Sequence, residues 1–424
     1  MVCAMPRSLK IKPECIERIK SAVQRNCFPS QKALATELGL TRSTVSNFLN
    51  GKPVDYLNFV EISEKLGYGW QEIAAKPEDN LKQPDDNHSS PAAIYVERPP
   101  IEANCYQTIM QPGALLRVKA PQEMGKTRLM HRLLEYAREQ GYKTVDLSFE
   151  LADKTVFLDF QKFCQWFCVA VGDRLDKPNK LTDYWDEILA FNYNTTSYFQ
   201  KYLLTETTQP LVLALDNVDL VFEHTAISTD FCNLLRSWHN QARTGDRNSR
   251  IWQKLSLVIV HATDIYGSLN INYSPLANVG LTITLPEFNA EQLQDLAQQN
   301  QLNCHATEVK QLMSLVGGQP YLAQLAFNRI KYDGFTLARI LQEAHTEAGI
   351  YSNHLRQKLV NLQQFPELAT AFMKVVTQEN PVQLGSALVF KLQGMGLIKL
   401  DKDTAKVRCE LYRRYFSTRL SSKD

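Results

Sequence analysis

The sequence predicts an α/β chain in which a doubly wound parallel sheet is preceded by an all-α unit and followed by a winged helix. Apolar runs typical of buried strands, at 114–118, 211–215 and 255–260, alternate with segments of helical periodicity. The first of these runs enters a tight turn that contains Gly125 and opens directly into a helix. Near the end of the sequence, two short alternating stretches on either side of 401–404 predict a hairpin that follows a helix, which is typical of a winged helix.

Composition places the chain among ordinary globular proteins of two to four domains. Its 424 residues are 44% hydrophobic and 22% charged, and the formal net charge is only +2. Any contact with nucleic acid must therefore come from a local basic patch. No apolar run approaches the length of a membrane span, and the first residues are too poor in apolar side chains for a signal peptide. The nine cysteines form no CxxC pair, so we expect free thiols, a reducing cytoplasm and no membrane partner.

Shifts in composition divide the chain into five segments. One polar stretch is rich in proline, aspartate and asparagine and has almost no core-forming residues, which is typical of a flexible linker. A Gly-Gly-Gln-Pro corner interrupts the helical region that follows the sheet. The expected segments are a helix-turn-helix unit at 8–75, a linker at 76–93, the sheet domain at 94–287, a helical lid at 288–350 and the winged helix at 351–424.

The N-terminal unit contains two apolar stripes at helical spacing. They are Leu34, Ala35 and Leu38, and then Val45, Phe48 and Leu49. Gly39 between the stripes allows a left-handed turn, and Thr41 is suited to cap the second helix. This spacing resembles the helix-turn-helix of phage repressors. The resemblance makes the second helix a recognition helix, and the residues it would direct at base edges are Arg42, Ser43, Thr44 and Asn47.

Two functions of this unit stay open. Between Lys10 and Lys65, nine lysines and arginines stand against six acidic residues, which is only a weakly basic balance. The same fold also serves as an adaptor that docks onto a protein partner. DNA binding is the preferred hypothesis, and recruitment of a protein is the alternative.

Residues 120–127, Ala-Pro-Gln-Glu-Met-Gly-Lys-Thr, predict a phosphate-binding loop because a strand precedes them and a good helix former follows. Backbone N–H groups in such a turn form an anion site that the positive end of the helix dipole reinforces. Gly125 permits the turn, Lys126 would reach the outer phosphates of ATP or ADP, and the Thr127 hydroxyl would bind Mg²⁺. Ala120 stands where such loops usually have their first glycine.

A second motif supplies the expected partner of this loop. The apolar run 211–215 ends in Asp216, whose carboxylate should emerge at the sheet edge where ligands of doubly wound folds bind. Asp216 is therefore expected to hold Mg²⁺ opposite Thr127. ATPases of this broad class usually carry glutamate at the next position, whereas Asn217 can orient a water but cannot accept its proton. We expect nucleotide binding with hydrolysis that is slow at most.

Other side chains complete the expected site. The next apolar run ends in Thr263 and Asp264, where ATPases of this kind sense the γ-phosphate. Tyr95 and Arg98 come just before the core strands, where contact with the base and plain packing fit them equally. The arginines from Arg408 onward fit either a phosphate contact or a solvated face.

Six separate stretches follow one another in an order that one family shares. They are residues 95–102, 119–127, 235–238, 272–280, 315–322 and 408–413. Together they resemble the AAA-like ATPase domain that is abundant in cyanobacteria and belongs to the STAND group of signal-transduction ATPases. The resemblance covers about residues 93–420 and implies that the glycine-proline corner places Pro320 near the adenine. No arginine follows the sensor strand, and Arg236 is only a weak candidate for one that acts in trans.

STAND proteins act as switches in which a nucleotide between the sheet domain and the winged helix holds a closed form until exchange or an input signal opens it. The resemblance therefore implies a nucleotide-gated DNA-binding regulator that can form homo-oligomers in response to nucleotide. A signalling or conflict-system adaptor is the alternative, and a DNA motor ranks last because of Asn217. A steep loss of DNA affinity with salt would distinguish the regulator from the adaptor.

Overall fold

The computed structural model describes residues 8–12, 15–25, 33–35, 38, 40, 42–66, 68, 73–74, 94–264, 276 and 278–420. The chain divides into two compact units, residues 1–92 and 93–424. Within the described ranges, the helices are too short or too polar to cross a membrane.

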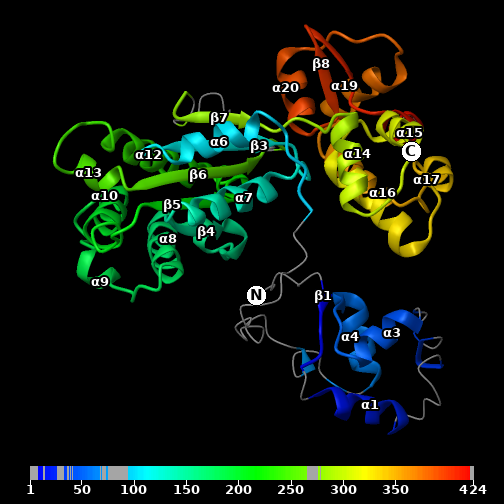
Figure 1. The fold of residues 1–424 in the computed structure, drawn as a ribbon, viewed down its shortest axis with the longest axis horizontal. Coiled ribbons are helices and arrows are strands. Elements are labelled where there is room, and N and C mark those ends of the chain that lie inside the picture. Colours follow the sequence, from blue (N-terminus) through cyan, green and yellow to red (C-terminus); the bar gives the residue numbers. More distant parts are fainter. Residues whose placement is uncertain are drawn as a thin grey trace. The chain divides into compact units, whose positions relative to one another are not determined.

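The described part of the N-terminal unit combines helices with one short pair of strands (Figure 1). Its elements are α1 (Ile16–Arg25), α3 (Arg42–Leu49), α4 (Tyr56–Lys65), β1 (Ser8–Leu9) and β2 (Val54–Asp55). β1 pairs antiparallel with β2, and a further bridge joins Ile11 to Ala74. The prediction that this unit is all-α is wrong, because the unit contains this short pair of strands. Leu9 and Val54 bury their side chains in the helical core, and pairing satisfies the backbone groups of these extended segments.

The two predicted apolar stripes contribute to the core of this unit. Their members are buried or half-buried in one cluster, namely Leu34, Ala35, Leu38, Val45, Phe48 and Leu49. Phe48 packs edge-on against Phe59 of α4 with 4.9 Å between ring centroids. The predicted turn residue Gly39 and cap Thr41 lie outside the described residues.

The second unit is built on a five-stranded sheet in the order β4-β5-β6-β3-β7. The strands are β3 (Leu115–Ala120), β4 (Lys143–Ser148), β5 (Leu211–Asp216), β6 (Leu255–Ala262) and β7 (Leu281–Thr284). All neighbouring pairs are parallel, which confirms the predicted parallel sheet. Their carboxyl ends consequently meet at one edge, where the candidate site is assembled.

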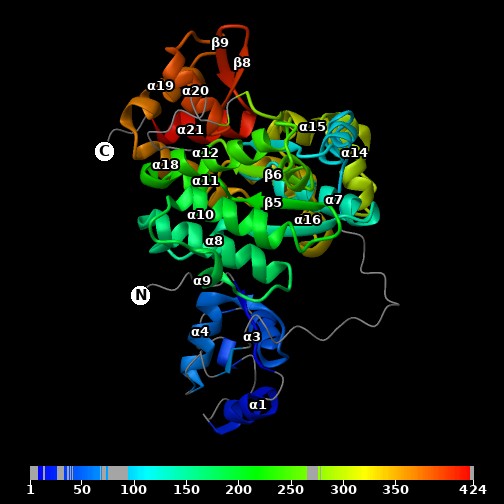
Figure 2. The same ribbon diagram turned by 90° about the vertical axis from the view of Figure 1, so that its left-hand side faces the viewer.

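Helices cover both faces of this sheet because side chains alternate along its strands (Figures 1 and 2). Leu213 and Leu215 of β5 pack into one core with α8, α10 and α12, whereas Val212 and Ala214 pack into a second core with α6 and α7. The covering helices are α6 (Ile101–Ile109), α7 (Lys126–Glu139), α8 (Phe160–Arg174), α10 (Phe191–Tyr198) and α12 (Thr225–Gln241). Shorter helices are α9 (Leu181–Tyr184), α11 (Asp219–Phe222) and α13 (Ser249–Trp252).

The region after the sheet shares a further hydrophobic core. Its helices are α14 (Ala290–Gln299), α15 (Ala306–Val316), α16 (Pro320–Asp333), α17 (Leu337–Glu343), α18 (Ser352–Gln363), α19 (Pro366–Thr377), α20 (Ser386–Gly394) and α21 (Glu410–Arg419). An antiparallel hairpin of β8 (Ile398–Asp401) and β9 (Thr404–Val407) lies between α20 and α21, as the alternating pattern predicted (Figure 2). The boundaries predicted inside this unit, at 287/288 and 350/351, stay predictions.

Candidate functional site

The predicted phosphate loop connects β3 to α7. Ala120, which replaces the usual first glycine, ends β3 as a fully buried strand residue, so the left-handed freedom of glycine is not needed there. Gly125 immediately precedes α7 with φ of 87°, a backbone conformation that residues with a side chain rarely adopt. The loop therefore presents the start of α7 in the way that anion-binding turns require.

Lys126 lies folded across this loop. Its Nζ donates a hydrogen bond to the carbonyl oxygen of Pro121 at 2.9 Å. Burial lowers the pKa of Lys126, while the charges of Asp219, Asp264 and Asp216 oppose that shift. The binding of an incoming phosphate by Lys126 stays a prediction.

Thr127 and Asp216, the two predicted Mg²⁺ ligands, lie in direct contact. The Thr127 hydroxyl donates to Oδ2 of Asp216 at 2.8 Å. Asp216 is buried at the end of β5, whereas Thr127 is exposed in the first turn of α7. A hydroxyl and a carboxylate at an open edge are oxygen donors of the kind that Mg²⁺ takes, so these residues fit the ion.

Asn217 lies beside this pair in a left-handed conformation with φ of 55°. Its side-chain amide donates to the Ser148 hydroxyl at 3.0 Å, and its backbone N–H donates to Oδ1 of Asp216 at 2.9 Å. These residues border a cavity of about 360 Å³ that also reaches His131 and Glu150. Sequence reasoning missed Ser148, which pairs in register with Asp216 across β4 and β5.

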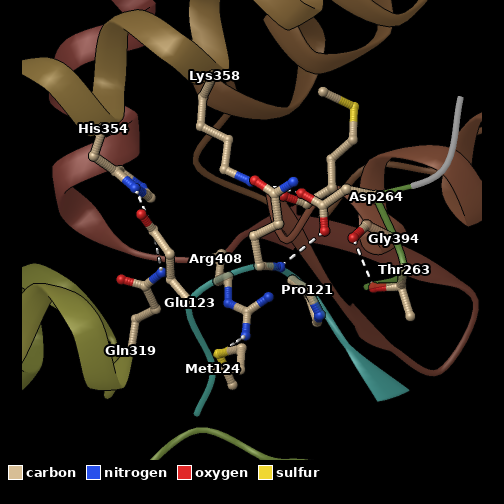
Figure 3. A network of polar contacts seen from close by, with 12 residues as sticks. Pro121, Glu123, Met124, Thr263, Asp264, Gln319, His354, Lys358, Gly394 and Arg408 are labelled. Atoms are coloured by element: carbon tan, nitrogen blue, oxygen red, sulfur yellow. Dashed lines mark hydrogen bonds and ion pairs between the residues drawn. The ribbon is translucent and has the colours of Figure 1, made fainter. Parts of the chain in front are cut away.

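Thr263, the predicted γ-phosphate sensor, contacts the C-terminal part of the same unit. Its hydroxyl donates to the carbonyl oxygen of Gly394 at 2.9 Å (Figure 3). A Cβ added to Gly394 would lie 2.6 Å from the Thr263 carbonyl oxygen, so this close approach requires glycine. The sensor role of Thr263 stays a prediction.

Asp264 and Lys358 form a buried ion pair beside the loop. Oδ2 of Asp264 accepts from Nζ of Lys358 at 2.8 Å, and Oδ1 accepts from the backbone N–H of Gln122 at 2.9 Å. Lys358 belongs to α18 and also donates to the Met395 carbonyl oxygen at 2.8 Å. Nothing in the local sequence around Lys358 indicated this contact.

A second contact joins the loop to α18. Nδ1 of His354 lies 2.7 Å from Oε2 of Glu123, and Nε2 of His354 lies 2.8 Å from the Tyr412 hydroxyl. Burial alone would raise the pKa of Glu123, but the hydrogen bond and charge of His354 outweigh it and lower that pKa. Glu123 is thus held as a carboxylate against the C-terminal helices.

The predicted glycine-proline corner also reaches the loop. Gly318 has φ of 80°, and a Cβ there would lie 2.1 Å from the Phe288 carbonyl oxygen, so the corner needs glycine. Pro320 begins α16, and the preceding Gln319 donates its side-chain amide to Glu123 at 3.4 Å. The placement of Pro320 near an adenine stays a prediction.

Two arginines contact Met124 in the middle of the loop. Arg98 donates to the Met124 carbonyl oxygen at 2.9 Å and lies over the Phe288 ring at 4.4 Å. Arg408 contacts the Met124 sulfur at 3.4 Å and pairs with Glu287, so it is not part of a solvated face. Arg98 therefore packs on the loop itself, which was one of the two interpretations of this residue.

The predicted DNA-contacting residues lie on α3 of the N-terminal unit. Asn47 is exposed and Thr44 is half-buried. Arg42 and Ser43 begin the same helix, but their side chains lie outside what the structure describes.

The fold and this loop define a P-loop ATPase domain, and comparison with known families agrees. The sequence model of the AAA-like domain matches residues 83–418. The chain therefore belongs to the AAA-like domain family. A second model, that of a helix-turn-helix, matches residues 30–73.

Similar folds occur among solved structures. The Walker-type ATPase PABY2304 of Pyrococcus abyssi is 12% identical with a TM-score of 0.54, over 76% of this chain and 96% of that chain. The ORC2 protein of Aeropyrum pernix is 13% identical with a TM-score of 0.43, over 80% and 98%. Domain III of the replication initiation protein DnaA of Thermotoga maritima is 13% identical with a TM-score of 0.35, over 64% and 94%. The Pyrococcus likeness supports the fold alone, and none of the curated proteins matches this sequence.

Proposed function

We propose that this chain is a nucleotide-gated, DNA-binding regulator of the STAND type. The observation that carries the proposal is the union, in one chain, of a phosphate loop in contact with Asp216 and a segment that matches a helix-turn-helix. The loop binds ATP or ADP with Mg²⁺, and the N-terminal unit reads DNA. The scattered cysteines of the sequence, which form no CxxC pair, favour the reducing cytoplasm as its compartment.

The chain's own residues divide the work of binding nucleotide. Lys126 exchanges its bond to Pro121 for the outer phosphates, since an ammonium pairs more strongly with a charged oxygen than with a carbonyl. Thr127 and Asp216 hold Mg²⁺, which neutralises phosphate charge when bound. Asn217 positions a water without accepting its proton, so hydrolysis is slow and the ATP state is long-lived.

The contacts between the loop and the C-terminal helices provide the gate. In this proposal the segment 351–424, with α18, α19, α20, the β8–β9 hairpin and α21, is the winged helix. Thr263 contacts α20, Arg408 contacts Met124, and α18 contacts Glu123. A nucleotide that enters the loop adds negative charge beside the loop residues that make these contacts, so the closed form responds to its presence. Release of the C-terminal part would then permit nucleotide-dependent assembly of several copies.

DNA reading is favoured over a protein-docking role by the exposed Asn47 on α3, since asparagine suits hydrogen bonding to adenine in the major groove. The adaptor alternative keeps one specific observation in its support, which is the weakly basic balance of nine cations against six acids between Lys10 and Lys65. An adaptor would present the same helix to a protein partner.

The test is selection of DNA from a random pool by the full chain, followed by affinity measurements in ATP, in ADP and without nucleotide. We expect a selected sequence whose binding weakens steeply as salt rises, through counterion release, and whose affinity differs between the nucleotide states. The Lys126→Ala variant is the control, because it should bind the DNA without responding to nucleotide. The proposal fails if no DNA is retained even at low salt, and a protein recovered in a parallel pull-down would then support the adaptor.

A further inference from the structure

A cavity of about 510 Å³ lies where the carboxyl end of the sheet meets α20 and the β8–β9 hairpin. Residues of β3, β6 and β7 line it together with residues of α20 and β8. Its volume is typical of sites that hold a small molecule. Gly125, Lys126, Thr127 and Asp216 do not line it, so it is distinct from the predicted phosphate and Mg²⁺ site.

The sheet side of this cavity carries a cation that no acid accompanies. Lys119 of β3 lies in register with His261 of β6 and Thr284 of β7, so the three side chains share one face of the sheet. Burial and the charge of Arg117 both lower the pKa of Lys119, and no carboxylate of the described residues opposes them. Burial also lowers the pKa of His261 to about 4, so its ring is uncharged at neutral pH.

The surrounding chain does not supply the missing negative charge. Of the described residues that line the cavity, Glu287 alone is acidic, and it already pairs with Lys399 and Arg408. Residues 265–280, which connect β6 to β7, contain no aspartate or glutamate. The lining thus carries three cations and one carboxylate. Because charged side chains are rarely buried without a partner, this balance favours a negatively charged occupant.

Much of the remaining lining is apolar. Its apolar members are Pro121, Leu285, Pro286, Phe390, Ile398 and Leu400. Phe390 and Leu400 are 45% and 39% exposed, so an apolar group that enters the cavity would remove hydrophobic surface from water. The cavity therefore offers both a charge and an apolar wall to one ligand.

We infer that this cavity binds a small organic anion with an apolar body, and that its occupant weakens the binding of nucleotide. The anionic group would lie beside Lys119, and the apolar body would lie against Phe390 and Leu400. The effect on nucleotide rests on the proposed function, whereas the binding of the anion does not. Such a ligand would serve as an input signal of the switch.

The cavity borders the phosphate loop, which gives its occupant a route to the nucleotide. Pro121 lines the cavity, and its carbonyl oxygen holds Nζ of Lys126 at 2.9 Å. A Cβ added to Gly396 would lie 2.9 Å from Cβ of Pro121, so the segment after α20 packs directly on the loop. The charges of Lys119 and Lys126 both lower the pKa of His261, so these two cations lie near the same ring. An anion beside Lys119 would therefore repel phosphates held by Lys126.

The probe is hexanoate, titrated into the full chain at pH 7 and followed by saturation-transfer NMR. Three compounds serve as comparisons. 1-Hexanol and hexylamine keep the apolar body but carry a neutral or a positive head group, and acetate keeps the charge without that body. We expect hexanoate to bind at least about tenfold more tightly than each of them. This comparison needs no variant, so it tests the inference even if a variant fails to fold.

Variants then locate the site. Lys119→Met keeps the apolar stem and removes the charge, so it should weaken hexanoate at least about tenfold and change 1-hexanol by less than about threefold. Phe390→Ala should weaken both compounds, because both contact the apolar wall. Lys391→Met is the matched control, since Lys391 adjoins Phe390 on α20 and forms an exposed ion pair with Glu367. It should leave both affinities unchanged. Thermal unfolding checks that each variant is folded.

The effect on nucleotide is measured as the dissociation constants of ATP and ADP over a range of hexanoate concentrations. We expect both constants to rise at least about fivefold and then to level off, because two separate sites have a finite coupling. A rise without limit would show that hexanoate and nucleotide compete for one site, which would overturn the inference. Unchanged constants despite bound hexanoate would overturn its second part.

Equal affinities of hexanoate and 1-hexanol would overturn the anion site, as would equal losses of both in Lys119→Met. Failure to bind hexanoate by a chain that still binds ATP would overturn the inference and leave the proposed function intact. If the chain binds neither ATP nor ADP, the proposed function falls together with the effect on nucleotide. The hexanoate titrations decide the anion site in that case too.

Discussion

Replacement of Asn217 tests how this site handles water. Asn217 has φ of 55°, a left-handed region that asparagine and aspartate enter more readily than other residues with side chains. Its amide donates to Ser148 at 3.0 Å and borders the cavity beside Thr127 and Asp216. Asn217→Asp therefore introduces a carboxylate at this place, because aspartate has the same shape as asparagine and tolerates the same backbone conformation. Asn217→Glu introduces the carboxylate that related ATPases use, but in a strained backbone.

The structure sets the expected magnitudes. General-base assistance is commonly worth about 10²–10⁴ in rate, which is roughly 2.7–5.4 kcal/mol of barrier. Left-handed backbone costs other residues about 1–2 kcal/mol, so Asn217→Glu should lose about that much unfolding free energy, whereas Asn217→Asp should lose little of it. Asn217→Ala is the control, since it carries the same strain, lacks the carboxylate and also loses the bond to Ser148, worth about 1 kcal/mol.

Phosphate release is the assay, followed over a range of protein concentrations because a neighbouring subunit can supply an arginine on assembly. We expect slow turnover by the unmodified chain, a gain of severalfold or more for the Asp and Glu variants, and no gain for the Ala variant. ATP affinity should not tighten. Fast turnover by the unmodified chain, or no gain from either carboxylate at any concentration, would show that another residue activates the water. Equal stability of the Asp and Glu variants would refute the backbone argument.

Three further outcomes are expected. Lys126→Ala should abolish binding of a fluorescent ATP analogue while the fold stays intact, since that ammonium is a point charge that no other residue of 120–127 supplies, and unchanged affinity would remove the phosphate-loop assignment. Arg42→Ala with Asn47→Ala should weaken DNA binding by about 1–3 kcal/mol per base contact with thermal stability nearly unchanged, whereas loss of a protein partner without any DNA binding would favour the adaptor. Burial lowers the pKa of His261 from 6.5 to about 4, so between these values the unfolded chain binds a proton that the folded chain does not. Stability should therefore fall by about 2 kcal/mol from pH 7 to pH 5 through this group, and denaturant unfolding of His261→Gln should lack that loss; an identical pH dependence would contradict the argument.

The sequence by itself determined those parts of the site that depend on short-range order. A strand, a turn with Gly125 and a helix are local features, so the phosphate loop was predictable from residues 120–127. The contact of Thr127 with Asp216 was predictable too, because parallel strands end at a common edge. The apolar stripes of the N-terminal unit followed from helical periodicity, whereas the two-residue strands β1 and β2 were too short to show any.

Tertiary structure alone decided which partners surround the loop. The hydrogen bond from Asn217 to Ser148 depends on β4 lying next to β5. The sequence of neither strand specifies this order of strands in the sheet. Asp264 and Lys358 are 94 positions apart and meet only because α18 packs beside the loop. A lysine or an acid in a polar stretch of sequence predicts a solvated side chain, and only the packing of distant helices buries this pair. The physical reason is that an ion pair between distant residues leaves no local pattern in the sequence, whereas a buried strand or the apolar face of a helix does.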